Sequence, residues 1–209
     1  MHPRDYLSWS SLNMLGNFSP KAIERWKDYY IYGNKFGTNK GMAFGKQMAT
    51  GLEDEEATGD DVLDSVMTII PKFDIMDKEF FVELKTGKRF TSGELETIKI
   101  LCRPDTMKAN MTAFKEYKTS QKRWTKKQVD DFGQITFYAM GMYLRTGKIP
   151  SDIELVEIET KSALDGKIEC TGEVIRHPTV RTMGQILNMM VRCRRAWSMI
   201  SKIMEEELL

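Results

Sequence analysis

The sequence has few of the residues that build metal–sulfur centres. It contains three cysteines, Cys102, Cys170 and Cys193, which are widely spaced and form no CxxC pair. A zinc or iron–sulfur site therefore has no support in the sequence. An odd number of scattered cysteines is typical of free thiols in a reducing compartment. There are two histidines, His2 and His177, and neither receives a role.

Long apolar runs are missing too. No stretch approaches the roughly 18 consecutive apolar residues of a transmembrane helix. The N-terminus lacks the apolar run of a signal peptide. We therefore expect a soluble, intracellular protein with no membrane contact.

The sequence also lacks an excess of positive or of negative charge. Lysine and arginine total 31, aspartate and glutamate total 30, and the formal net charge is +1. This balance does not indicate a generally basic nucleic-acid binder, although a single groove can still be basic. Hydrophobic residues make up 41% of the 209 residues, enough for a sizeable core. No repeat or linker divides the chain, which predicts one domain over residues 1–209.

The first 72 residues have a helical pattern. Apolar residues recur at helical spacing, and Ser10 and Ser11 are candidate caps for the first helix. Asp60 and Asp61 are candidate caps for the last one, which Pro71 ends. The expected helices begin near residue 10, with a break at 19–20, and continue over 21–32, 40–56 and 61–70.

The middle of the chain changes to the alternating pattern of strands. Turn residues at 86–88, 92–93 and 108–110 separate the first strands. The order of elements indicates an α/β or α+β fold in which helices flank a central mixed sheet. The expected elements are strands at 79–84, 96–102 and 112–118, a helix at 125–145, strands at 153–160 and 167–175, and a helix at 180–206.

Two carboxylates and a lysine are the strongest candidates for chemistry. Asp105 follows one expected strand, and Glu116 and Lys118 end the next one. Residues i and i+2 of a strand share a face, so Glu116 and Lys118 project together, on the side opposite Tyr117. If the two strands are neighbours, Asp105 joins them at one point.

Such a cluster suits the hydrolysis of a phosphodiester. Carboxylate oxygens suit a hard cation such as Mg²⁺, which polarises a phosphoryl oxygen and makes bound water more acidic. A lysine beside them orients or helps to deprotonate the attacking water, or stabilises charge on the phosphate. Taken alone, the same spacing also fits the alternating charges of a solvated strand.

These residues and three further motifs resemble the RecB-like branch of the PD-(D/E)XK nuclease superfamily. Residues 7–12 (LSWSSL) resemble its LSxSSL helix start, and residues 45–53 (GKQMATGLE) its GxxxHxxLE motif. Asp105 falls at the second motif, residues 116–118 at the third, and residues 134–138 (QITFY) at the QxxxY motif. The resemblance covers about residues 6–160 and implies a restriction-endonuclease-like fold. Its parts are a helical region 1–72, a catalytic core 73–176 and a C-terminal helix 177–209.

The resemblance also implies roles for the matching residues. Asp105 and Glu116 are expected to bind the metal, with the backbone carbonyl of Tyr117 as a third ligand. Glu53 approaches the metal directly or through water, and Lys118 is the catalytic lysine. The expected metal is Mg²⁺, with Mn²⁺ as the second option.

Gln134 and Tyr138 lie one helical turn apart on one face. The resemblance implies that they line the site and contact the nucleic-acid backbone or the active-site strand. The plainer alternatives are core packing for Tyr138 and a solvated position for Gln134.

The sequence departs from the family pattern in two places. Ala49 stands where the family has a histidine that often binds the metal. The four cysteines that hold an iron–sulfur cluster in some relatives are missing, so no cluster is expected.

Basic residues follow the expected catalytic strand and could grip phosphates, with one tryptophan among them to stack on a base. An ordinary charged loop is the alternative. A second basic patch on the last helix, at 192, 194 and 195, fits DNA contact less well than a solvated or partner-binding face. The first group consists of Lys122, Arg123, Trp124, Lys126 and Lys127.

The expected function is a Mg²⁺-dependent deoxyribonuclease, an exonuclease in recombination, repair or phage DNA metabolism. Its partner is DNA, and its location is the cytoplasm of a bacterial or phage-infected cell. A homo-oligomer or a recombination partner protein is left open. One rival is a non-catalytic nucleic-acid-binding or scaffold member of the fold, suggested by Ala49. Another is a helical interaction module built on the methionine-rich last helix.

Overall fold

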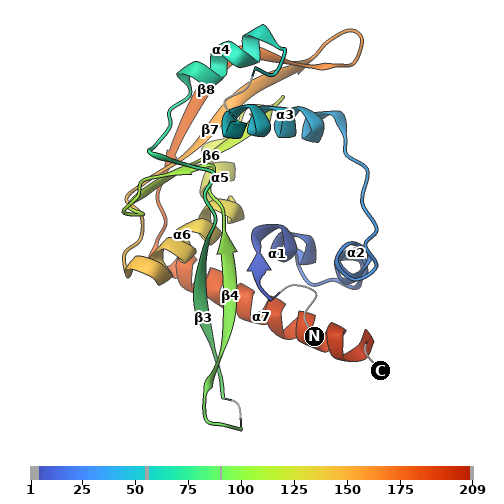
Figure 1. Ribbon diagram of the computed structural model, residues 1–209, viewed down its shortest axis with the longest axis vertical. Coiled ribbons are helices and arrows are strands. Elements are labelled where there is room, and N and C mark those ends of the chain that lie inside the picture. The colour runs from blue at the N-terminus through green and yellow to red at the C-terminus, as the bar shows by residue number, and fades with distance from the viewer. Residues whose placement is uncertain (1–4, 55–56, 90, 208–209) are drawn as a thin grey trace.

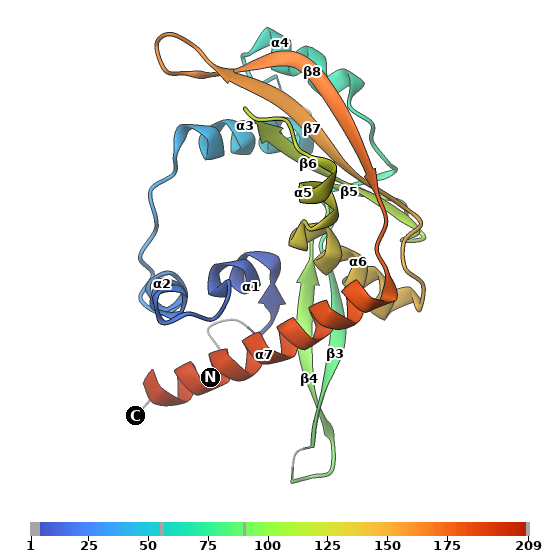
Figure 2. The same cartoon turned by 180° about the vertical axis from the view of Figure 1, so that it is seen from behind.

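The computed structural model of the protein describes residues 5–54, 57–89 and 91–207, with Glu53 and Asp54 described by their backbone alone. Figures 1 and 2 show strands in two sheets with helices packed on both sides. The strand orders are β1-β4-β3 and β2-β5-β6-β7-β8, and each sheet combines parallel and antiparallel pairs. The expected mixed α/β fold with flanking helices is therefore observed, with its strands divided between two sheets.

The five-stranded sheet separates two layers of helices. Its central pair, β6 and β7, is parallel, so residues directly opposite each other share a face. Tyr117 and Val156 point to one face, where they pack with α3 (Lys40–Asp54) and α4 (Asp61–Ile69). Phe114 and Leu155 point to the other face and join the larger core with α6 (Gly133–Thr146). The strands are β2 (Ile75–Met76), β5 (Thr106–Met107), β6 (Ala113–Ser120), β7 (Asp152–Ser162) and β8 (Ile168–Thr179).

The three-stranded sheet brings the N-terminus to the centre of the molecule. β1 (Leu7–Ser8) pairs in parallel with β4 (Leu95–Cys102), and β4 pairs with β3 (Phe80–Arg89). α1 (Trp9–Leu15) packs on α2 (Pro20–Tyr30), whose Trp26 is fully buried and donates its indole N–H to Ser11 Oγ at 2.9 Å. α7 (Met183–Glu207) runs across α1 and α6.

The hairpin of β3 and β4 is longer than expected and projects from the body (Figure 1). The turn expected at 86–88 is wrong, because β3 continues to Arg89. Gly87 has φ +88° and lies within a register shift of the two strands, so its turn-like signal marks an irregularity. The chain reverses further on, where Gly93 has φ +87°.

The helix expected at 125–145 is two helices. α5 (Lys126–Asp130) starts with a capping box at Thr125, and α6 starts at Gly133. A Cβ on Gly133 would lie 2.5 Å from the Trp9 ring, so only glycine allows this close approach. The break is set by a contact with a residue far away in the sequence, which a local pattern does not contain.

The first helix begins earlier than expected. Ser8, not Ser10 or Ser11, is its N-cap and accepts the backbone N–H of Ser11 at 3.4 Å. The hydroxyl of Ser11 is used instead by Trp26. Among the helices of the described residues, none is both long and apolar enough to cross a membrane.

Candidate active site

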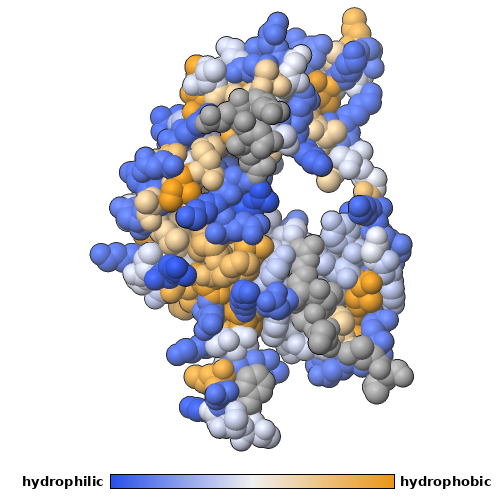
Figure 3. All heavy atoms as spheres, viewed as in Figure 1, coloured by the Kyte–Doolittle hydropathy of each residue, from blue (hydrophilic) through white to orange (hydrophobic). Residues whose placement is uncertain are grey.

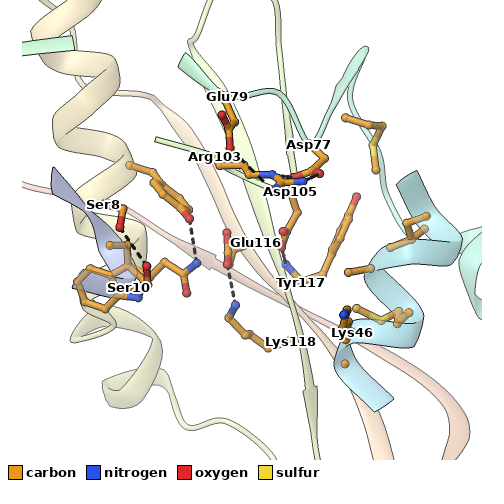
Figure 4. Close-up of a pocket in the computed structure, with 18 of the residues that line it drawn as sticks. Ser8, Ser10, Lys46, Asp77, Glu79, Arg103, Asp105, Glu116, Tyr117 and Lys118 are labelled. Carbon is orange, nitrogen blue, oxygen red and sulfur yellow. Dashed lines mark hydrogen bonds and ion pairs between the residues drawn. The ribbon is translucent and has the colours of Figure 1, made fainter. Parts of the chain in front are cut away.

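Strand β6 places Glu116 and Lys118 on one face, as the i, i+2 spacing predicts. Lys118 Nζ lies 2.7 Å from Glu116 Oε1 (Figure 4). Glu116 is 1% exposed, whereas the Lys118 side chain is 29% exposed. The pair therefore joins a buried carboxylate to a lysine whose side chain is partly exposed.

Asp105 joins this pair through a strand that the sequence did not reveal. The expected neighbour of β6, the strand at 96–102, is β4 and belongs to the other sheet. The two-residue β5, directly after Asp105, pairs with β6 instead. Asp105 Oδ2 then accepts the backbone N–H of Tyr117 at 2.6 Å. Two ladder residues carry no periodic signal, which is why β5 was missed.

Burial and mutual repulsion shift the pKa values of this cluster. Burial and, after it, the charge of Asp105 raise the pKa of Glu116 to about 8, although Lys118 opposes them. Burial also raises the pKa of Asp105, although Lys118 and the Tyr117 N–H oppose this. Burial works to lower the pKa of Lys118, but the two carboxylates outweigh it and raise that pKa. Without a further cation, the two carboxyl groups of the cluster therefore hold protons more tightly than free carboxyl groups do.

One carboxylate oxygen of the cluster has no partner. Glu116 Oε2 is buried and makes no hydrogen bond to any of the described residues. A buried, unpaired carboxylate oxygen is unfavourable, and a cation there would lower the pKa of both carboxyl groups. The donor set of Asp105 and Glu116 thus fits a hard divalent ion. Three or more His, Cys, Asp or Glu side chains do not converge anywhere in the described residues, so these two carboxylates would need backbone or water ligands as well.

Helix α3 forms the wall of the site opposite α1. A Cβ on Gly45 would lie 3.3 Å from Thr119 Oγ1, so glycine lets the helix lie close to β6. Ala49 lines the cavity, so the position of the family's histidine faces the site without an imidazole. The expected metal-binding carboxylate of Glu53 lies outside the described side chains.

Helix α6 brings Gln134 and Tyr138 to the same cavity. Gln134 Nε2 donates to the Tyr138 hydroxyl oxygen at 3.0 Å. Burial raises the pKa of Tyr138, and the charge of Glu116 adds to this, so the hydroxyl stays protonated. Tyr138 also packs edge-on against Phe114, so it belongs to the core as well as to the cavity.

The cavity is lined by residues outside the sequence motifs as well as by residues within them. Its volume is about 680 Å³, and it extends from the β1–α1 segment to α3. Ser8 and Ser10 share a hydrogen bond of 3.0 Å at one side, and Lys46 lines the other (Figure 4). Of the eleven described residues that we expected to act in catalysis, metal binding or nucleic-acid binding, those that line the cavity are Asp105, Glu116, Tyr117, Lys118, Gln134 and Tyr138.

Sequence reasoning missed an ion-paired group at the rim. Arg103 Nε donates to Asp77 Oδ1 at 2.6 Å, and Arg103 Nη1 lies 3.8 Å from Glu79 Oε1. Asp77 has φ +39°, a strained conformation for a residue with a side chain, and its N–H donates to the Asp105 carbonyl oxygen at 2.8 Å. The Arg-Pro-Asp sequence at 103–105 was the one available signal for Arg103, and none was available for Asp77.

The basic residues after β6 lie outside the cavity lining. Arg123 pairs with Glu159 at 3.2 Å and Glu173 at 2.7 Å. Lys126 pairs with Asp130 at 2.6 Å, and Trp124 packs edge-on against a neighbouring ring of the core. Contact of this group with DNA, including the exposed Lys122 and Lys127, stays a prediction.

The arginines of α7 are used within the chain. Arg194 Nε donates to the Lys85 carbonyl oxygen at 2.8 Å, and the Arg195 guanidinium lies 4.5 Å from the Phe18 ring centroid. Arg192 is half-buried, and burial lowers its pKa. The N-terminal half of α7 exposes apolar residues at helical spacing, namely Met183, Leu187 and Val191.

Comparisons with known proteins identify the fold of this chain. The sequence matches no family model and no curated protein. An exonuclease candidate from Eubacterium rectale has a TM-score of 0.56 at 11% sequence identity, covering 97% of this chain and 82% of its own. An alkaline exonuclease from Laribacter hongkongensis, LHK-Exo, has a TM-score of 0.41 at 11% identity, covering 98% and 94%. The likeness to the first of these confirms the expected restriction-endonuclease-like α/β fold.

Proposed function

We propose that the protein is a divalent-metal-dependent DNA nuclease that acts as an exonuclease. The observation that carries this proposal is the buried, unpartnered oxygen of Glu116 beside Asp105 and Lys118 in one cavity. Among the described residues Glu157 Oε1 is also buried without a partner, but Glu157 does not line the cavity, whereas Glu116 does. The fold shared with an exonuclease candidate agrees with the proposal.

Asp105 and Glu116 would hold Mg²⁺, together with the Tyr117 carbonyl oxygen and Glu53. The ion supplies Lewis-acid polarisation of the scissile phosphate and acidifies water. The protein holds Asp105 in place through the Tyr117 N–H and Glu116 through Lys118, so both carboxylates are oriented before the ion arrives.

Lys118 is the one cation of the cluster that solvent reaches. With its pKa raised, it remains an ammonium at neutral pH. We assign it the role of orienting the attacking water and stabilising charge on the phosphate. Gln134 and Tyr138 would contact the phosphate backbone with their amide and hydroxyl groups, which already form a hydrogen-bonded pair.

DNA digestion with Mg²⁺, Mn²⁺ or EDTA tests the proposal directly. Cutting that requires metal and is lost in Lys118→Ala and Asp105→Asn supports it. Lys148→Ala, an exposed lysine beyond α6, is the matched control and should cut normally. Wild-type rates in both site variants would contradict the assignment.

Calorimetry with Mg²⁺ and Mn²⁺ separates a nuclease from a non-catalytic member of the fold. The absence of an imidazole at Ala49 favours this second candidate. Folded protein that binds no divalent ion and cuts no DNA would be a nucleic-acid-binding or scaffold protein.

A further inference from the structure

The chain forms a closed ring around an opening beside the cavity. Residues 31–39, here called the arch, connect α2 to α3 and stand away from the body (Figures 1 and 2). On the far side of the ring α3 packs on β6, and Phe114 of β6 contacts Tyr138 of α6. Helix α6 packs on β4, which pairs with β1, and α1 then packs on α2. Figure 3 shows this opening passing through the molecule in the space-filling view.

The candidate active site lies in the wall of this opening. The cavity takes Ser8 and Trp9 from one side of the ring and Lys46 from α3 on the other. Glu116 and Lys118 lie between these two sides (Figure 4). A polymer that reaches Lys118 therefore lies between α1 and α3, within the ring.

The α2 end of the arch is held by aromatic contacts and a hydrogen bond. Phe36 stacks on Tyr29 with ring centroids 5.9 Å apart, and the Arg25 guanidinium lies 4.7 Å from the Phe36 centroid. The Tyr32 hydroxyl donates to Glu207 Oε2 of α7 at 2.8 Å. The arch therefore starts from a fixed position against α2 and α7.

The α3 end of the arch is held as well. Asn39 Oδ1 accepts the backbone N–H of Met42 at 2.8 Å, which caps α3. Lys40 Nζ donates to the Gly166 carbonyl oxygen, in the turn between β7 and β8, at 2.6 Å. With both ends tied, and with residues 32–39 exposed to solvent, the arch bridges the opening without filling it.

We propose that the substrate is a single nucleic-acid strand that enters by a free end and threads through the ring, under the arch. This rests on the proposed nuclease function. The ring is closed by continuous chain along the arch and by packing contacts elsewhere, and a circle cannot enter it while those contacts hold, so circles would be excluded whatever their sequence. A nine-residue arch reaches at most about 30 Å even when fully extended. The cavity of about 680 Å³ has the size of a small-ligand pocket, which suits a few unpaired nucleotides rather than a duplex.

The lining of the opening suits a single strand. The lining holds three cations, Lys46, Arg103 and Lys118, beside four carboxyl groups, Asp77, Glu79, Asp105 and Glu116, so the metal ion of the proposed function would add the positive charge that phosphates need. Tyr6 and Trp9 offer rings. Sequence-independent binders of single strands combine these two features, because phosphates meet the cations while bases stack on the aromatic faces.

A trapping experiment tests threading without relying on catalysis. A single-stranded oligonucleotide carrying biotin at both ends is bound to the Lys118→Ala protein, and streptavidin is added either before or after binding. Threading predicts that streptavidin added first prevents binding, and that streptavidin added second slows dissociation by about tenfold or more. Equal binding and equal dissociation in both orders would overturn the inference.

Opening the arch tests the same inference by activity. A protease recognition sequence inserted between Asn34 and Lys35 allows the arch to be cut in the folded protein. The two ends stay in place because Trp26 anchors α2 in one core and Phe44 anchors α3 in the other. The matched control carries the same insertion between Ser92 and Gly93, at the tip of the β3–β4 hairpin, outside the ring.

Wild-type protein and the cut hairpin control should degrade linear single strands and spare single-stranded circles. The cut arch variant should gain cutting of circles by about tenfold or more. If wild type cuts circles as fast as linear strands, threading is wrong and the nuclease function stands. If the cut arch still spares circles, recognition of ends and not threading excludes them. If neither linear nor circular DNA is cut, the proposed function fails, and the trapping result alone decides whether the ring admits a strand.

Discussion

Lys115 and Glu116 are neighbours in β6 and point to opposite faces of the sheet. Each belongs to a cluster of charged residues, and the two clusters differ in how their carboxylate oxygens are paired. On one face Lys115 is 3% exposed and its Nζ lies 2.6 Å from Glu154 Oε2. Arg176 donates to both Glu154 oxygens, at 2.6 and 3.2 Å. On the other face Glu116 has one lysine partner and one oxygen without any. Both carboxyl groups are buried, Glu116 the more deeply at 1% exposed against 7% for Glu154, and they differ in their partners.

The pKa directions follow the pairing. Burial opposes ionisation of Glu154, yet the hydrogen bonds from Arg176 and Lys115 lower its pKa overall. For Glu116, burial and the charge of Asp105 raise the pKa. A buried carboxylate whose oxygens are paired is part of the fold. A buried carboxylate with an unpaired oxygen is unfavourable, and a bound cation would reduce this cost. The comparison agrees with the proposal that Glu116 and its neighbours form the functional cluster.

The largest expected effect is a loss of activity, and it distinguishes Lys118 from Lys115. Lys118→Ala should reduce DNA cutting by about 10²- to 10⁴-fold, because it removes the amine that faces the substrate. The measurement is the initial rate of digestion with Mg²⁺, beside Lys148→Ala. Unchanged cutting would mean that Lys118 only neutralises Glu116.

Lys115→Ala should act on stability instead. Removing one of the two partners of a buried carboxylate costs about 3 kcal/mol. Arg176 remains, and the stacking of Lys115 Nζ, 4.4 Å from the Phe73 ring centroid, is lost. Denaturant unfolding measures the loss, and activity per folded molecule should match wild type well below the melting temperature. A loss of activity without a loss of stability would assign Lys115 to the site and remove the contrast.

The two carboxylates should give opposite dependences of stability on pH. The folded pKa of Glu116, about 8, lies above its ordinary 4.5, so the folded state binds the extra proton in this window. The free energy of unfolding therefore falls as pH rises from about 4.5 to 8, by up to about 1.4 kcal/mol for each pH unit. The lowered pKa of Glu154 stabilises the fold at neutral pH, and this contribution is lost in acid.

Denaturation in EDTA across pH 5–9, an interval of about four units chosen to bracket the window, measures this dependence. Glu116→Gln should flatten it and raise stability at the alkaline end. Mg²⁺ should do the same for wild type, because a bound cation favours the ionised carboxylates. The same slope in Glu116→Gln and wild type would show that another group titrates.

The smallest expected effect concerns the missing imidazole. Ala49→His places a ring nitrogen on the wall of the cavity and should tighten Mn²⁺ binding by about tenfold, with a smaller gain for Mg²⁺, because imidazole suits Mn²⁺ better than Mg²⁺. Calorimetry measures both affinities. Thr50→His, the adjacent residue of α3 that also lines the cavity, is the control for a ring added one position away. Equal gains in both variants would mean that the added ring acts without regard to its position.

The periodic parts of the molecule could be predicted from the sequence. The helices, the long strands and the shared face of Glu116 and Lys118 follow from repeats of apolar and polar residues. The cap at Asp60 was also predicted, and Asp60 Oδ1 accepts two N–H groups of α4, both at 3.0 Å. These features depend on residues close together in the chain.

Features set by distant contacts could not be predicted. The start of α6 depends on Trp9 beside Gly133, and the position of Asp105 depends on a two-residue strand. The buried Arg181, which donates to the Val129 carbonyl oxygen and to Thr136 Oγ1, also gave no signal. The partners of Gly133 and Arg181 lie far away in the sequence, and the strand that places Asp105 is too short to show a period.

The sequence by itself determined the candidate site residues and the fold class that holds them. Side-chain type and strand period are local, so Glu116, Lys118 and the flanking motifs were already recognisable. The tertiary structure decided how those residues meet. It attached Asp105 to β6 through the Tyr117 N–H, left Glu116 Oε2 without a partner and closed the chain into a ring beside them. Burial and pairing arise only when distant segments pack, and they decide which charged residues stabilise the fold and which remain available to a ligand.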